Sequence, residues 1–170
     1  VAYAEKNGGM WIDVALGTDL LVINAIARVI VENGWQDAEW IKKWVNNKWE
    51  SSSGFGQGTR NTPWQWRTTW GKFQTKGFED WKKWLMAQDE FKPENAAKVA
   101  QIDVKKIYTA AEWMAKPSGG KRPKTSIMIE KGLYWSNNTG NTQAISALGI
   151  IVGAGGRPGQ MIGRGGGHQR

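Results

Sequence analysis

The segment that most constrains the fold is an apolar stretch at residues 20–33. Its apolar side chains fall on nearly every side of a helix rather than along one face. Such a helix must be buried on most sides, so other elements have to pack around it. Asn24 and Arg28 interrupt the apolar run, which is therefore far shorter than the ~20 apolar residues that a membrane span needs. We expect this helix inside a globular domain, with Gly34 ending it.

Length and composition limit the possible functions. The chain has 170 residues, enough for one domain with a core. It does not begin with Met and it stops just after a glycine run, so we expect a piece of a longer protein. It contains no cysteine, which excludes an iron–sulfur cluster or structural zinc site within this stretch, and its one histidine is His168. A net charge of +8 suits an anionic cofactor, an anionic substrate or nucleic acid.

Periodicity and capping residues predict the remaining elements. Short strands are expected at 11–15 and 125–133, with a turn-rich connection over 134–141. Helices are expected at 38–47 after Asp37, 78–88, 94–100 after Pro93, 104–115 after Asp103, and 143–152. The alternation of strands and helices predicts the α/β class, as part of a doubly wound, mostly parallel, Rossmann-like sheet. The whole chain, 1–170, is expected to be a single partial domain.

Tryptophans recur on predicted helix faces, where core packing is their expected use. The chain has twelve of them, and five lie on such faces: Trp40, Trp44, Trp81, Trp84 and Trp113. Three others, Trp64, Trp66 and Trp70, stand among basic residues, as they would in a stacking platform for bases. A basic, tryptophan-rich domain that binds single-stranded nucleic acid is therefore an alternative of a different class. It predicts an affinity that falls steeply with salt.

Two stretches show neither helical nor strand periodicity. Residues 51–77 are rich in Ser, Gly, Thr, Asn and Trp, and are expected to form a long loop that is functional or packed on the surface. Residues 153–170 form a glycine-rich tail. Its first glycines resemble a dinucleotide-binding loop, but that motif must follow a strand and open a helix. Here they follow a predicted helix, so a glycine cap leading into a loop is the better interpretation.

Two short patterns carry candidate binding chemistry. Thr18 and Asp19 lie between a predicted strand and a helix, where open α/β sheets bind ligands. The Asp19 carboxylate can accept two N–H bonds from a guanine edge, or it can simply cap the helix. Arg164 and His168 stand among glycines that let a ligand approach closely, and both are oxyanion donors. A flexible basic loop is the alternative there.

Three stretches together resemble the large subunit of arsenite oxidases, in the dimethyl sulfoxide reductase family of molybdenum enzymes. They are Gly17-Thr18-Asp19-Leu20 with its helix to residue 30, residues 124–141 with Trp135-Ser136-Asn137-Asn138, and the stretch from Gly156-Arg157-Pro158-Gly159 to Gly167-His168-Gln169. The likeness to arsenite oxidases in particular rests on the loop from Ser51 to Trp70 and on the spacing of Arg164 and His168. The resemblance covers essentially the whole chain.

The resemblance implies a function for the longer protein. That protein would oxidise arsenite to arsenate by two electrons, at molybdenum held by two molybdopterin guanine dinucleotides. An iron–sulfur cluster would lie in a part of the subunit outside this chain. Implied partners are a small Rieske iron–sulfur subunit and an external electron acceptor such as a cytochrome or copper protein, in the periplasm. No nucleic acid and no membrane span are expected, and another oxyanion oxidoreductase of the same family is the alternative.

The resemblance also assigns roles to parts of this chain. It implies that residues 51–77 form a long surface or funnel loop and that residues 153–170 form a glycine-rich cofactor or substrate loop. No residue here is implied as a catalytic group or as a ligand of the metal. Arg164 and His168 match the positions that form the arsenite pocket. Residues that match positions near the cofactor, with guanine recognition at Asp19, are Thr18, Asp19, Asn137, Asn138 and Gln169.

Overall fold

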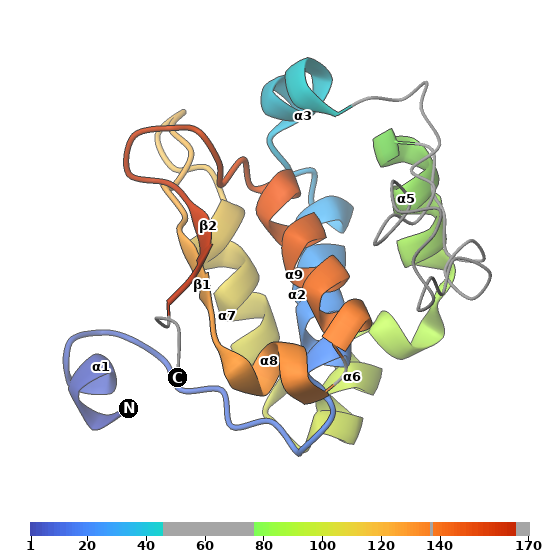
Figure 1. The fold of residues 1–170 in the computed structure, drawn as a ribbon, viewed down its shortest axis with the longest axis vertical. Helices are drawn as coiled ribbons and strands as arrows, with labels where there is room; N and C mark the ends of the chain where they lie inside the picture. The colour runs from blue at the N-terminus through green and yellow to red at the C-terminus, as the bar shows by residue number, and fades with distance from the viewer. Residues whose placement is uncertain (46–76, 137, 166–170) are drawn as a thin grey trace, which may run out of the picture.

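The computed structural model describes residues 1–45, 77–136 and 138–165 (Figure 1). Within these residues, short helices dominate and the sheet is small. The α-helices are α1 (Ala2–Lys6), α2 (Asp19–Glu32), α3 (Ala38–Trp44), α5 (Gly77–Ala87), α6 (Pro93–Ala100), α7 (Val104–Ala115), α8 (Lys131–Ser136) and α9 (Asn138–Ile151). A 3₁₀-helix, η2, spans Asp89–Phe91, and the strands are β1 (Ile127–Ile129) and β2 (Ile162–Arg164).

Helix α2 is the centre of the fold, as its apolar pattern predicts. Every residue from Val22 to Val31 is buried, and α6, α7 and α9 pack around the helix. Burial extends to Arg28, whose Nε lies 2.7 Å from Glu32 Oε1 and whose Nη1 donates to the carbonyl oxygen of Gln88 at 2.8 Å. These two partners replace the water that the guanidinium loses. The helix ends at Glu32, and Gly34 follows with φ at 66°.

The two strands form a parallel pair, which confirms the α/β class. Ile127 is opposite Ile162, and Ile129 is opposite Arg164. Parallel strands need a crossover connection, and α8 and α9 supply it between β1 and β2. Helix α9 packs so closely on β2 that a Cβ at Gly149 would lie 2.0 Å from Ile162 Cδ1. Glycine at this position therefore permits the contact between helix and strand.

Local signals predicted the capped helices well. Asp37 accepts a hydrogen bond from the Trp40 N–H at 3.0 Å, and Asp103 accepts one from the Lys105 N–H at 2.9 Å. Pro93 stands at the first position of α6, where its missing N–H costs nothing. Helix α3 is shorter than predicted, since it ends at Trp44 and Val45 is extended.

The predicted strand at residues 11–15 is wrong. These residues are irregular, and the Ala15 N–H bonds to the Ala100 carbonyl oxygen at the end of α6 instead of to a neighbouring strand. The alternation that suggested a strand has another cause. Ile12 and Val14 pack against the core, while Trp11 is exposed. An extended segment that covers helices shows the same period of two as a strand in a sheet.

The segment around β1 also differs from the prediction. The strand covers residues 127–129 of the predicted 125–133, and α8 begins at Lys131. The predicted connection at 134–141 is largely helical, because α9 begins at Asn138 rather than near residue 143. The predicted glycine-rich loop at 153–170 contains β2, which pairs through backbone groups and so needs no apolar run.

Two of the tryptophans expected in the core are exposed. Trp44 is 63% exposed and Trp113 is 54% exposed. The other three, Trp40, Trp81 and Trp84, are half-buried. Of the predicted loop at 51–77, only Gly77 lies within the described residues, where it begins α5. Among the described residues, no helix is both long and apolar enough to cross a bilayer.

Candidate functional site

The direction of the elements defines one edge of the fold as the candidate site. In a β–α–β unit, the connecting helix begins at the carboxyl ends of the strands, so α9 begins at the edge where β1 and β2 end. Helix α2 runs parallel to α9, since the Asp37 N–H just beyond α2 bonds to the Ile151 carbonyl oxygen at the end of α9. Figure 1 shows both helices beginning at the lower end of the fold. Open α/β sheets bind ligands at this carboxyl edge.

Thr18 and Asp19 are located at this edge, at the start of α2. Thr18 is the N-cap residue, and its buried hydroxyl donates to the Ala15 carbonyl oxygen at 2.6 Å. Asp19 is the first residue of the helix and is half-buried. The cap position therefore belongs to Thr18, and Asp19 is not the cap. A carboxylate in the first turn is also favoured by the helix dipole, independently of any ligand.

Arg164 ends β2 at the same edge, beside the residue that follows β1. Its Nε lies 3.5 Å from Oε1 of Glu130, and each of the two side chains is 44% exposed. The Gly165 N–H donates to the Ile129 carbonyl oxygen at 2.9 Å, which fixes the backbone next to Arg164. A guanidinium carries five N–H donors in a planar fork, a geometry that suits carboxylates and other oxyanions.

The remaining predicted residues are only partly within the described chain. Asn138 is the first residue of α9, which places its backbone at the same edge. Asn137, His168 and Gln169 lie outside the described residues. The structure thus brings Thr18, Asp19, Asn138 and Arg164 to one edge of the fold, although they are distant in sequence.

Two helix N-termini give this edge a geometry that suits an anionic group. Helices α2 and α9, each of 14 residues, both direct their amino-terminal N–H groups there, and such ends attract phosphate. Across the described residues, there is no group of three or more His, Cys, Asp or Glu side chains that could hold a metal ion.

A second charged cluster, which the sequence did not predict, lies at the opposite end of the helices. Asp37 Oδ2 is 2.5 Å from Arg157 Nη1 and 3.6 Å from Arg122 Nε. Arg122 also donates to the carbonyl oxygens of Trp35 and Gln36. The cluster joins α3, the loop before β1 and the turn after α9, so it holds three separate segments together.

Asp37 is buried but ionised. Burial alone would raise the pKa of its carboxyl, yet the hydrogen bonds from Arg157 and from the Trp40 N–H, with the charges of Arg157 and Arg122, hold that pKa below its usual value. Burial lowers the pKa of Arg122, and the charge of Asp37 opposes that effect. The carboxylate therefore serves both as helix cap and as counterion. The cap was predictable, but its cationic partners lie 85 and 120 residues away along the chain, with no local pattern to reveal them.

The chain is similar to subunits of known oxidoreductases. It is 55% identical to the iodate reductase subunit IdrA of Denitromonas iodatirespirans and 52% identical to that of Pseudomonas sp. (strain SCT). Each alignment covers 100% of this chain and 19% of the relative. The arsenite oxidase subunit AioA of Herminiimonas arsenicoxydans is 27% identical over 99% of this chain and 17% of its own length. The chain thus spans about a fifth of the curated relatives that it matches, and no protein-family model matches it.

Proposed function

We propose that this chain is a segment of the catalytic subunit of a molybdenum oxyanion oxidoreductase, in the dimethyl sulfoxide reductase family, and that the intact subunit reduces iodate. The observation that carries the proposal is similarity at 55% and 52% identity, along the whole chain, to subunits of iodate reductases. Similarity at 27% identity to an arsenite oxidase subunit supports the same family. The difference in identity favours iodate over the arsenite that the sequence suggested.

The charge of the chain agrees better with iodate than with arsenite. Iodate is an anion at any working pH, whereas arsenite is neutral near pH 7, so only iodate is attracted by a positive surface. The chain carries a net charge of +8, and Arg164 lies at the carboxyl edge. Its guanidinium donors match oxyanion geometry. We assign Arg164, with His168 beyond the described residues, to binding of the oxyanion.

The proposed chemistry divides between cofactor and protein. Removing one oxygen atom from iodate takes up two electrons and two protons and releases water. Molybdenum held by two molybdopterin guanine dinucleotides would supply the two-electron chemistry when bound. The residues of this chain would bind the cofactor and the oxyanion and orient them relative to each other. We assign Thr18, Asp19, Asn137, Asn138 and Gln169 to the cofactor, with the Asp19 carboxylate accepting N–H bonds from guanine.

The proposed partners follow from the direction of electron flow. The relatives are named as subunits, which indicates that each works in a complex. For iodate reduction, a cytochrome or copper protein would donate electrons, through a small Rieske subunit and an iron–sulfur cluster outside this chain. We place this complex in the periplasm.

The substrate assignment is tested on the intact enzyme with its partner subunit. We expect iodate-dependent oxidation of reduced viologen, and slower or no reduction of a dye by arsenite. Arsenite oxidation is the second candidate, favoured by the similarity to AioA. Arsenite turnover without iodate turnover would contradict the iodate proposal and support the second candidate.

The role of Arg164 and His168 is tested by substitution. Arg164→Ala and His168→Ala should each lower kcat/KM for iodate by about 10²-fold, the scale of a lost oxyanion donor, while molybdenum content stays normal. Two control variants should keep most of the iodate turnover. Glu130→Gln removes the ion pair with Arg164 but keeps the guanidinium. Lys121→Ala removes an exposed cation from the opposite edge of the fold. Near-normal turnover in both His168→Ala and Arg164→Ala would refute the site.

A further inference from the structure

A groove of about 870 Å³ lies at the end of the fold opposite the candidate oxyanion site. Helix α3, which follows the end of α2, forms one wall, and the turn at residues 155–157, which follows the end of α9, forms the other. A helix of 14 residues is about 21 Å long, and α2 separates the groove from Asp19 by that length. The groove is therefore independent of the carboxyl edge, and its size is typical of small-molecule sites.

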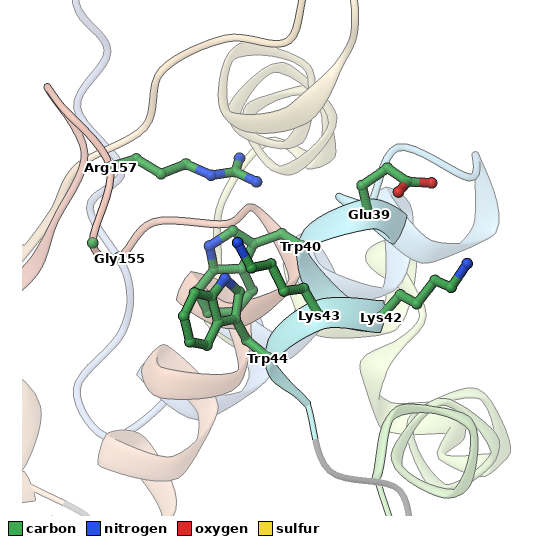
Figure 2. A pocket seen from close by; sticks show the side chains of 8 residues that line it. Glu39, Trp40, Lys42, Lys43, Trp44, Gly155 and Arg157 are labelled. Atoms are coloured by element: carbon green, nitrogen blue, oxygen red, sulfur yellow. The ribbon is translucent and has the colours of Figure 1, made fainter.

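An aromatic pair forms the wall on α3. Trp40 and Trp44 are four residues apart and so share one face of the helix, with ring centroids 6.4 Å apart and planes tilted by 44°. Trp44 is 63% exposed, which makes it a large apolar surface open to a ligand. In Figure 2, the two rings lie together on the side of the groove that faces Gly155 and Arg157. Planar rings of this kind stack on nucleic bases whatever their sequence.

Two cations lie near this aromatic pair. Lys43 Nζ lies over the face of the Trp44 ring, 5.0 Å from its centroid. Arg157 reaches toward the groove from the opposite wall, whereas Glu39, the acidic residue of the lining, points away from the tryptophans (Figure 2). A base that stacked on this face of Trp44 would displace the exposed Lys43 ammonium from the ring to the edge of the ligand, where its charge can meet the phosphates.

The position of Arg157 is fixed before any ligand arrives. Its Nη1 is held by Asp37, which is 4% exposed. The turn sits directly over this ion pair, because a Cβ at Gly153 would lie 2.8 Å from Asp37 Oδ2 and 2.9 Å from Arg157 Nη1. A cation held in place loses little conformational freedom on binding, so it contributes more to affinity than a mobile one.

We propose that this groove binds a nucleoside phosphate, with the base on the Trp40–Trp44 pair and the phosphates between Lys43 and Arg157. The aromatic pair selects a planar ring, and the two cations select an attached anion. The concave shape and the convergence of two walls favour a small molecule over a flat protein partner. This site is additional to the oxyanion site and does not depend on which oxyanion the enzyme reduces.

The test uses the intact subunit with its own cofactor bound. The cofactor then occupies its own site, so any added nucleotide that binds must bind at a different site. ADP, adenosine and pyrophosphate are titrated separately by calorimetry. We expect ADP to bind at least about tenfold more tightly than adenosine or pyrophosphate, because only ADP uses both stacking and charge. No ADP binding up to about 1 mM, or equal binding of ADP and pyrophosphate, would overturn the proposal.

Variants locate the binding. Trp44→Ala and Lys43→Ala should each weaken ADP binding by about tenfold or more, whereas Trp44→Phe should keep most of it. Trp44 and Lys43 are exposed, so neither substitution removes core packing. Lys98→Ala, at an exposed position of α6, is the matched control and should change nothing. ADP binding that survives both Trp44→Ala and Lys43→Ala lies elsewhere, and that result contradicts the assignment.

Discussion

Replacing Asp37 by Asn removes the negative charge at the centre of the second cluster while keeping the side-chain shape. Asn caps a helix as well as Asp does, so the bond to the Trp40 N–H should survive. The substitution removes the ion pairs of Asp37 with Arg157 at 2.5 Å and with Arg122 at 3.6 Å. These arginine side chains are 36% and 29% exposed, so water will partly replace the carboxylate. We expect the local stability around α3 to fall by about 2 kcal/mol, within the range for a hydrogen bond to a charged group.

Hydrogen exchange of the α3 backbone measures this change in the intact subunit. The N–H groups of Ile41 and Val45 each bond within or next to α3 at 2.9 Å, and they exchange when α3 opens. A loss of about 2 kcal/mol corresponds to roughly 30-fold faster exchange of these amides. Asp13→Asn is the matched control, because Asp13 pairs with Lys106 on the surface and lies far from α3 in the chain. This variant should leave the exchange of the α3 amides unchanged.

The pH dependence gives an independent check on the same carboxyl. The pKa of Asp37 is lower in the folded chain than in the unfolded chain, so folding releases a proton between the two values. Its stabilisation is complete above the unfolded pKa of about 3.9 and is lost as the pH falls through the lower, folded value. Relative to the intrinsic exchange rate at each pH, the protection of the α3 amides should fall below about pH 4 in the unsubstituted chain and much less in Asp37→Asn. Equal exchange of the two chains at neutral pH would refute the view that Asp37 holds α3 and the turn together.

Three further predictions concern other parts of the molecule. Gly149→Ala should destabilise the chain, because the clash with Ile162 costs about 1–3 kcal/mol, while the gain in helix propensity is only about 1 kcal/mol. Thermal unfolding measures the net effect, and a raised Tm would contradict the close contact. Tyr108 donates to Glu94 Oε1 at 2.8 Å, which raises the pKa of Tyr108 to about 12; ultraviolet titration should show that Glu94→Gln moves it back toward 10. Asp19→Ala in the intact enzyme should weaken retention of one guanine dinucleotide by about 1–3 kcal/mol; full molybdenum and pterin content after dilution and heating would show that Asp19 serves only the helix dipole.

The parts of the fold that local signals determine were predictable from the sequence. Pro93 and Asp103 act within a single turn, so they indicate where α6 and α7 begin whatever the surroundings. The all-round apolar pattern of α2 likewise required a central position. The strands were harder, because β1 and β2 have three residues each and pair through backbone groups. A period of two at residues 11–15 shows only which side chains face the core, and here the segment is irregular, with Ile12 and Val14 packed against the core.

The residues of the candidate site were proposed from short motifs and from the resemblance, and they stay a prediction. Thr18, Asp19 and Arg164 were named from motifs, and the chain direction of α2, α9 and β2 is what brings them to one edge. The groove was not predictable, because the helical spacing of Trp40 and Trp44 predicts that both side chains pack in the core. Only the position of α3 at the end of the fold leaves Trp44 exposed.

The central position of α2 has a consequence for synthesis of the protein on the ribosome. Helix α2 ends at residue 32, but α9, one of its main packing partners, ends at residue 151. At about 5–20 residues per second, roughly 6–24 s pass between the emergence of these two helices. Throughout that interval, one of the most apolar surfaces of the chain lacks its final cover. Nascent chains arrested between these points should therefore recruit chaperones more strongly than those arrested beyond α9.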